Sequence, residues 1–227
     1  MQSSSTDLSG IERYIAGDTA QSEFFRIFGF PSDLIRSAAV QALRKFTETD
    51  DRHSQRSAAG SVFYHTLVSL VRNALDAFDN WHASQDDDRL TSPRAYRADG
   101  LGLAFVQGLL GTGNMNSDLH LRKPLGKVTT LEIRQSHEVT QLELGEDAFT
   151  KALDARPQTL WLVIYAKDGN TVHLEVSLPA GVTEDGRITG WDKRIILDDV
   201  GMAESFVEDR NDDNDEGNDV TVAISAR

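Results

Sequence analysis

The sequence contains no cysteine and no long apolar run. The absence of cysteine excludes disulfides, thiolate metal sites and cysteine nucleophiles together. No window approaches about 18 consecutive apolar residues, so the sequence predicts no membrane-spanning helix. The first ten residues, MQSSSTDLSG, are polar and do not resemble a secretory signal. We therefore expect a soluble, cytoplasmic protein without membrane contact, and our working expectation is a microbial origin.

Basic residues are scarce in the second part of the chain. The formal net charge is −13; residues 1–130 hold 14 Lys and Arg against 15 Asp and Glu, whereas residues 131–227 hold 9 against 21. A bulk basic surface for nucleic acid is thus missing from the composition. This asymmetry predicts a protein partner with a basic surface, and contact with nucleic acid only indirectly or through a local basic patch. The first part does hold one small basic cluster, made of Arg122, Lys123 and Lys127.

The strongest structural signal is a β-hairpin in Gln158–Pro179. Leu160–Tyr165 is almost entirely apolar, and Thr171–Leu178 alternates between apolar and polar residues. The Asp168-Gly169 pair between them suits a tight turn, because the central residues of such turns need positive φ. The polar face of the second strand carries His173, Glu175 and Ser177.

Helical periodicity dominates the first half of the chain, and a period of two dominates the second. The segments predicted as helices are 33–47, 57–83, a short buried helix at 103–110 between glycine turns, and a short helix at 147–155. The segments predicted as further strands are 128–134, 139–144, 193–197 after a turn at Gly190, and 220–225.

This change of period predicts an α+β fold, in which a helical N-terminal half packs with a mostly antiparallel C-terminal β-sheet. We expect a helical region over 1–115 and a β-rich region over 116–227. The β-rich region includes an acidic loop at 208–219, whose composition is typical of a solvated segment. The two regions can share one core.

Two segments resemble the ATPase fold shared by histidine kinases and DNA gyrase. Leu70–Ala77, LVRNALDA, resembles the helix that carries the metal-binding asparagine of that family, here Asn73. Asp99–Leu110 resembles its glycine-rich lid, with Gly100 and Gly102. The resemblance implies Mg²⁺ and ATP as ligands, with an amide oxygen on the metal and glycine amides around phosphate. The DxGxG segment of the family is missing between the two matches.

Asp168 and Glu175, which flank the predicted hairpin, support a second enzymatic hypothesis. In nucleases with a D…ExK arrangement, carboxylates on adjacent strands hold Mg²⁺ beside the scissile phosphate, and a lysine stabilises charge. Here the residue two positions after Glu175 is Ser177 rather than lysine. The six histidines show neither HxxxH nor HExxH spacing, so no other metal site is predicted.

Two groups of residues are candidates for contact with a protein partner. The first is an aromatic-rich segment, with Phe24, Phe25, Phe28 and Phe30. The second places an aromatic residue among cations, with Arg187, Trp191 and Arg194. Arg and Trp are favoured interface anchors, whereas clustered aromatics are equally typical of a core.

No complete catalytic constellation is present in the sequence. The leading prediction is therefore a non-catalytic binding or assembly subunit of an intracellular complex, of a kind that handles nucleic acid. The alternative is an enzyme acting on nucleotides or nucleic acid through one of the two sets above. An enzyme would bring Asn73 or Glu175 into a cleft with other carboxylates, whereas a binding subunit would expose Phe24–Phe30 or Trp191 in an apolar patch.

Overall fold

The computed structural model describes residues 14–50, 52–83, 92–142 and 159–203. The predicted helix at 147–155, the acidic loop at 208–219 and the strand at 220–225 lie outside these ranges. The helices are α1 (Asp18–Phe28), α2 (Asp33–Glu48), α3 (Ala58–Leu75) and α4 (Lys127–Leu142). The strands are β1 (Tyr14–Ile15), β2 (Trp81–Ala83), β3 (Arg94–Arg97), β4 (Leu101–Gln107), β5 (Leu110–Gly113), β6 (Thr159–Asp168), β7 (Thr171–Val182) and β8 (Ile188–Gly201). None of these helices combines the length and the apolar character that crossing a bilayer requires.

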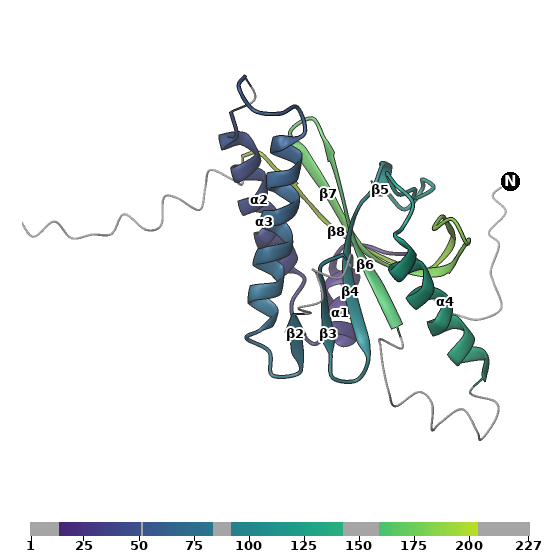
Figure 1. The fold of residues 1–227 in the computed structure, drawn as a ribbon. Helices are drawn as coiled ribbons and strands as arrows, with labels where there is room; N and C mark the ends of the chain where they lie inside the picture. The colour runs from purple at the N-terminus through teal and green to yellow at the C-terminus, as the bar shows by residue number, and fades with distance from the viewer. Residues whose placement is uncertain (1–13, 51, 84–91, 143–158, 204–227) are drawn as a thin grey trace, which may run out of the picture.

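Seven of the strands form one sheet in the order β1-β8-β7-β6-β4-β3-β2, and β5 lies outside it. β1 pairs in parallel with β8 and β4 pairs in parallel with β6, whereas the other four neighbouring pairs are antiparallel. Figure 1 shows α2 and α3 on one side of this sheet and α4 on the other. The predicted α+β class with a mostly antiparallel sheet is therefore confirmed.

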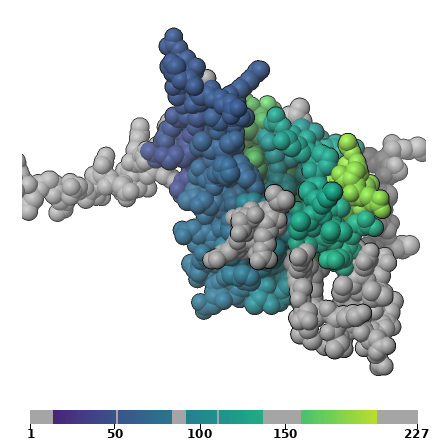
Figure 2. All heavy atoms as spheres, viewed as in Figure 1, coloured from purple at the N-terminus to yellow at the C-terminus, as the bar shows by residue number. Residues whose placement is uncertain are grey.

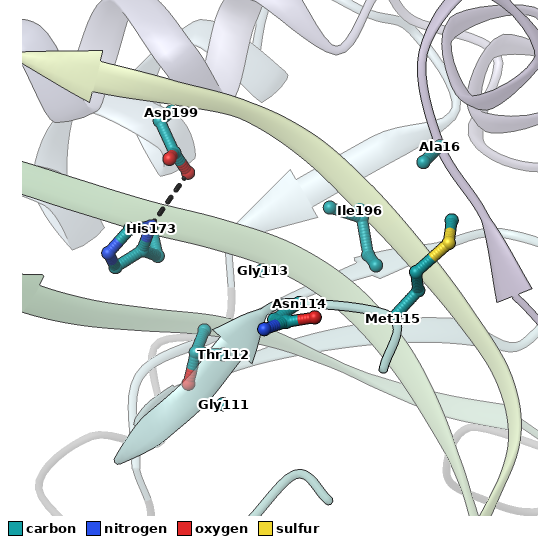
Figure 3. Close-up of a pocket in the computed structure, with 9 residues that line it drawn as sticks. All are labelled: Ala16, Gly111, Thr112, Gly113, Asn114, Met115, His173, Ile196 and Asp199. Atoms are coloured by element: carbon teal, nitrogen blue, oxygen red, sulfur yellow. Dashed lines mark hydrogen bonds and ion pairs between the residues drawn. The ribbon is translucent and has the colours of Figure 1, made fainter. Parts of the chain in front are cut away.

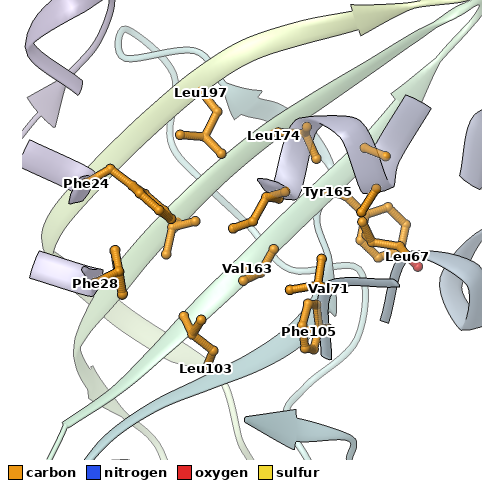
Figure 4. Packing of buried hydrophobic residues seen from close by; sticks show 14 of the residues in the cluster. Phe24, Phe28, Leu67, Val71, Leu103, Phe105, Val163, Tyr165, Leu174 and Leu197 are labelled. Atoms are coloured by element: carbon orange, nitrogen blue, oxygen red, sulfur yellow. The ribbon is translucent and has the colours of Figure 1, made fainter. Parts of the chain in front are cut away.

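Each face of the sheet carries a hydrophobic core. Helices α1, α2 and α3 cover the face that includes Val163 and Leu174 (Figure 4). Helix α4 and the segment between β4 and α4 cover the opposite face, which includes Leu162 and Ile164. Strand β6 is thus buried on both sides, which explains why Leu160–Tyr165 is a continuous apolar run rather than an alternating one.

The predicted hairpin is confirmed as β6 and β7. The turn lies one residue later than predicted: Asp168 pairs with Thr171, so Gly169-Asn170 rather than Asp168-Gly169 forms the connection, and Gly169 adopts a φ of 54°. The helix predicted over 33–47 is confirmed as α2. The strand predicted at 193–197 lies inside the longer β8, and Gly190 pairs with β7 within that strand rather than forming a turn.

The helix predicted over 103–110 is wrong, because most of this segment forms strand β4. Strand β4 lies between β3 and β6, so its backbone hydrogen-bonding groups are used on both sides. Consecutive side chains alternate between the two cores: Leu103 faces the larger one and Ala104 the smaller one. A short apolar run of this kind cannot be assigned to a helix or a buried strand by periodicity alone.

The strands predicted over 128–134 and 139–144 are also wrong, since Lys127–Leu142 is one helix, α4. Thr129 and Ile133, one helical turn apart, are both buried in it. The β-branched residues of this segment favour a strand only weakly, and packing against the sheet overrides that preference.

The helix predicted over 57–83 ends at Leu75, and Trp81 begins strand β2 instead of continuing the helical stripe. The Trp81 indole N–H donates to the carbonyl of Phe28 at 3.1 Å, which ties β2 to the end of α1. The region predicted as helical, 1–115, therefore also contains β1 to β5. The larger core includes buried side chains from both predicted regions.

The aromatic-rich segment supplies the centre of the larger core. Phe24, Phe28 and Phe30 are fully buried, whereas Phe25 is 56% exposed. The ring of Phe28 lies 4.5 Å from that of Phe24 and 5.2 Å from that of Trp161 on β6. These contacts connect α1 to the middle of the sheet.

We predict that Phe28→Ala lowers the free energy of unfolding by about 3–5 kcal/mol, because it leaves a cavity among packed rings. The matched control is Phe25→Ala, on the exposed side of the same helix, which should change it by less than about 0.5 kcal/mol. Urea unfolding followed by tryptophan fluorescence measures both. Equal effects of the two substitutions would contradict the core assignment.

Helix α1 is also tied to β8 by charge. The Lys193 ammonium lies 2.6 Å from a carboxylate oxygen of Glu23, and Arg26 makes a two-point contact with the same carboxylate. The hydrogen bonds from Arg26 first, and then from Lys193, lower the pKa of Glu23 from 4.5 to about 2. The carboxylate is therefore held in its charged form in the folded chain.

A lowered folded-state pKa stabilises the folded chain above the unfolded-state pKa, and this contribution is lost as the pH falls through the folded-state value. We predict that Glu23→Gln destabilises the protein at pH values above 4.5. The difference from the unmutated chain should shrink between pH 4.5 and about 2. Urea unfolding at a series of pH values tests this. A difference that stays constant over the whole range would show that Glu23 contributes nothing through its charge.

Candidate functional site

The two carboxylates predicted as metal ligands do not lie together. Glu175 pairs with Ile164 on β6, four residues before Asp168, which separates the two acids by roughly 13 Å along the sheet. Asp168 is exposed at the end of β6, whereas Glu175 is fully buried. Within the described ranges, no three His, Asp or Glu side chains gather closely enough to hold a metal ion.

The residues that resemble the ATPase family are placed in ordinary structural positions. Asn73 is exposed on α3. Gly100 lies in the turn between β3 and β4, and Gly102 pairs with Tyr96 on one side and Leu160 on the other. Because Gly102 lies in the interior of the sheet, it does not form a loop around phosphate.

The predicted partner-binding residues are divided between the core and the surface. Of the second group, Arg194 is 1% exposed, whereas Arg187 is exposed and forms an ion pair with Asp185. Trp191 is partly buried against the smaller core and donates its indole N–H to the carbonyl of Leu119 at 3.2 Å. A partner-binding role stays a prediction for the residues that remain accessible, namely Phe25, Arg187 and Trp191.

The small basic cluster lies on the surface, in the segment that joins β5 to α4 and at the first residue of that helix. Arg122, Lys123 and Lys127 are all exposed. Nearby, the amide of Leu125 donates to the carbonyl of Gly186 at 2.8 Å, which joins this segment to the turn between β7 and β8. Figure 2 shows the teal atoms of this segment against the yellow-green atoms of that turn.

Glu175 and Arg194 form a buried ion pair between β7 and β8. The Arg194 guanidinium donates to the two oxygens of Glu175 at 3.1 and 2.6 Å. Glu175 also accepts the hydroxyl of Ser177 at 2.7 Å and the amide of Gly113 at 2.8 Å. Both carboxylate oxygens are thus occupied by protein donors, which a charge buried to this degree requires.

The same guanidinium organises the loop that contains β5. It donates to the carbonyls of Gly111, Asn114 and Ser117 at 3.0–3.3 Å. The ring of Tyr14 on β1 lies over it, 5.6 Å from the ring centroid to the guanidinium carbon. Arg194 therefore fixes residues 111–117 against the sheet, with Tyr14 alongside.

Two glycines let this loop lie so close to its neighbours. Gly111 has a φ of 110°, and a Cβ atom there would lie 2.6 Å from the carbonyl oxygen of Asp118. Gly113 has a φ of 75°, and a Cβ atom there would lie 3.1 Å from the Cβ of His173. Side chains rarely adopt such φ values, so the glycines of this segment serve a tight loop rather than a helix.

A second buried ion pair holds α4. Arg94 on β3 is fully buried and donates to Glu132 on α4, and it also donates to the Thr129 hydroxyl at 2.7 Å. These contacts attach the start of α4 to β3, the strand next to the edge strand β2. The charged groups of both buried ion pairs therefore bind each other inside the fold, and neither pair is accessible to a ligand.

A pocket of about 380 Å³ lies between the β5 loop and the ends of β7 and β8. Its lining consists of Ala16, Gly111, Thr112, Gly113, Asn114, Met115, His173, Ile196 and Asp199. Figure 3 shows His173 and Asp199 at one end and Met115 at the other. Beside it, Tyr14 and Met115 are 43% and 44% exposed. We call the surface formed by Tyr14, Met115 and this lining the pocket face.

Most backbone amides in this wall already have acceptors. The N–H groups of Thr112, Gly113 and Asn114 donate to the carbonyl of Leu109, to Glu175 and to the carbonyl of Gly111, respectively. The Thr112 hydroxyl is buried and donates to the same Leu109 carbonyl at 2.8 Å. The wall therefore offers neither a nest of free amides for an anion nor a free hydroxyl nucleophile.

His173 and Asp199 form the accessible polar pair of the pocket. The Nδ1 of His173 lies 2.9 Å from Oδ1 of Asp199, and their side chains are 28% and 48% exposed. His173 could be placed on the polar face of its strand from the alternating sequence. Its contact with Asp199 could not, because a register shift between β7 and β8 follows Val172 and sets which residues meet.

Comparison of the chain with known protein families, characterised proteins and solved structures gives no match.

We predict that Glu175→Gln lowers the free energy of unfolding by about 3–5 kcal/mol, because it leaves the buried Arg194 without its counter-charge. The control, Glu184→Gln, removes a carboxylate that is 91% exposed and 3.8 Å from Arg134, and should cost less than about 1 kcal/mol. The double variant Glu175→Leu/Arg194→Met should be more stable than Glu175→Gln. Chemical unfolding compares them, and a near-neutral Glu175→Gln would contradict the role of the pair.

Proposed function

We propose that the protein is a non-catalytic binding subunit that docks onto a basic surface of a protein partner through its pocket face. The main support for this proposal is the position of Asp199. Its half-exposed carboxylate lies in a pocket flanked by two exposed apolar side chains, Tyr14 and Met115. Interfaces combine apolar anchors with a few charged groups at the rim in this way. The excess of acidic residues in the chain favours such a partner.

The positions of the remaining polar groups support binding rather than catalysis. Glu175 and Arg194 satisfy one another and the loop, and the Thr112 hydroxyl is engaged. In Figure 3 the second ring nitrogen of His173 is turned away from Ile196 and Met115. A general base needs to lie within hydrogen-bond reach of the proton that it removes, and this orientation does not favour that role toward a ligand in the pocket.

We place this binding in the cytoplasm, in line with the absence of cysteine from the chain. Proteins that handle nucleic acid carry basic surfaces, and they are the partners that the charge of this chain suits best. In that arrangement the contact with nucleic acid belongs to the partner.

Site-specific photo-crosslinking in cells that naturally contain the protein tests this proposal. Met115 is replaced by benzoylphenylalanine, and the control carries the same replacement at Gln41, which is exposed on α2, on the opposite side of the sheet. We expect a crosslinked partner from position 115 only, with the crosslinked peptide rich in Lys or Arg. Equal yields from both positions, or crosslinks to acidic peptides, would overturn the proposal.

A further inference from the structure

We propose that the pocket holds a lysine or arginine side chain of the partner, with Asp199 as its counter-ion. This inference rests on the proposed function and names the chemical group that the pocket takes. It follows from the hydrogen-bonding groups, the apolar surface and the charges that surround the pocket.

The hydrogen-bonding groups of the pocket favour a ligand that donates. The amides of Thr112 and Asn114 donate to carbonyls of the loop and that of Gly113 donates to Glu175, so they cannot bind a phosphate or carboxylate. The Asp199 carboxylate can accept further hydrogen bonds, because His173 contacts only Oδ1 and no described residue donates to Oδ2. A carboxylate can accept several hydrogen bonds, which suits an ammonium or a guanidinium group.

The apolar part of the lining suits the stem of such a side chain. Ala16, Met115 and Ile196 line the pocket away from the carboxylate. Lys and Arg pack their methylene groups along apolar surface while the charged head reaches a polar partner. The volume of about 380 Å³ is at the lower end of the range of ligand sites, and it suits one side chain better than a large cofactor.

The charges near the pocket leave Asp199 attractive to a cation. Arg194 is matched by Glu175, and Arg36 on α2 donates to the backbone carbonyls of Asp198 and Asp199 while pairing with Asp33 at 3.6 Å. The preceding residue, Asp198, is exposed but does not line the pocket. A ligand cation in the pocket therefore meets the Asp199 carboxylate, while the guanidinium groups of Arg194 and Arg36 are already paired.

Isothermal titration calorimetry of the full chain at physiological salt, where long-range attraction is screened, tests the inference. The probes are a twelve-residue peptide of alternating lysine and valine, the same peptide with acetylated lysines, and Nα-acetyl-lysine methylamide. We expect the unmodified peptide to bind, the acetylated one to fail, and Asp199→Asn to weaken binding about tenfold. The matched control Asp192→Asn, an exposed carboxylate on the same strand, should change affinity by less than about twofold.

Thermal unfolding of Asp199→Asn and of Asp192→Asn confirms that both variants are folded. Equal binding by Asp199→Asn and the unmutated chain would overturn the inference and leave the proposed function standing if position 115 still crosslinks to a basic partner. Binding of the free lysine derivative as tightly as the peptide would overturn the assignment to a protein side chain. Loss of the basic crosslinks would instead overturn the proposed function.

Discussion

Glu175 and Arg194 are withdrawn from water between β7 and β8, and only a full set of hydrogen bonds offsets the desolvation of two buried charges. The strands alone supply the two charged groups and the Ser177 hydroxyl. The remaining donors and acceptors come from the loop that contains β5, through the amide of Gly113 and three backbone carbonyls. The position of that loop is therefore a consequence of the buried pair.

The pocket face depends on this arrangement. Because the loop lies against the sheet, Gly113 approaches His173, and Asn114 and Met115 form one wall of the pocket. Glu175 accepts the Gly113 amide, and carbonyls of the loop accept the amides of Thr112 and Asn114, so these amides do not bind an anion. What remains accessible is a carboxylate, an imidazole and apolar surface, which is why a positively charged side chain is the ligand that suits the site best.

The sequence predicts the parts of the fold that local rules determine. The hairpin of β6 and β7 follows from strand alternation and the glycine between the strands, although the turn lies one residue later than predicted, at Gly169-Asn170. Helix α2 follows from its helical stripe. The sequence predicts a helix where strand β4 lies and strands where helix α4 lies. A short buried apolar run fits either a helix or a strand. In a segment rich in β-branched residues, packing against the rest of the fold determines which of the two forms.

The site was less predictable than the fold. Glu175 stood out in the sequence as a strand carboxylate, but the distant Arg194 and the Gly113 amide turn it from a metal-ligand candidate into a structural ion pair. His173 and Asp199 are 26 positions apart, and their contact depends on a register shift that no local pattern reveals.

Native-state amide hydrogen exchange of residues 108–121 tests the central claim that the buried pair holds the loop on the sheet. We predict that the Gly113 amide, which donates to Glu175, exchanges as slowly as amides of the central strands β6 and β7. Exchange of Gly113 at the rate of an exposed loop, while β6 and β7 remain protected, would show that the pair does not fix the loop and would contradict the account.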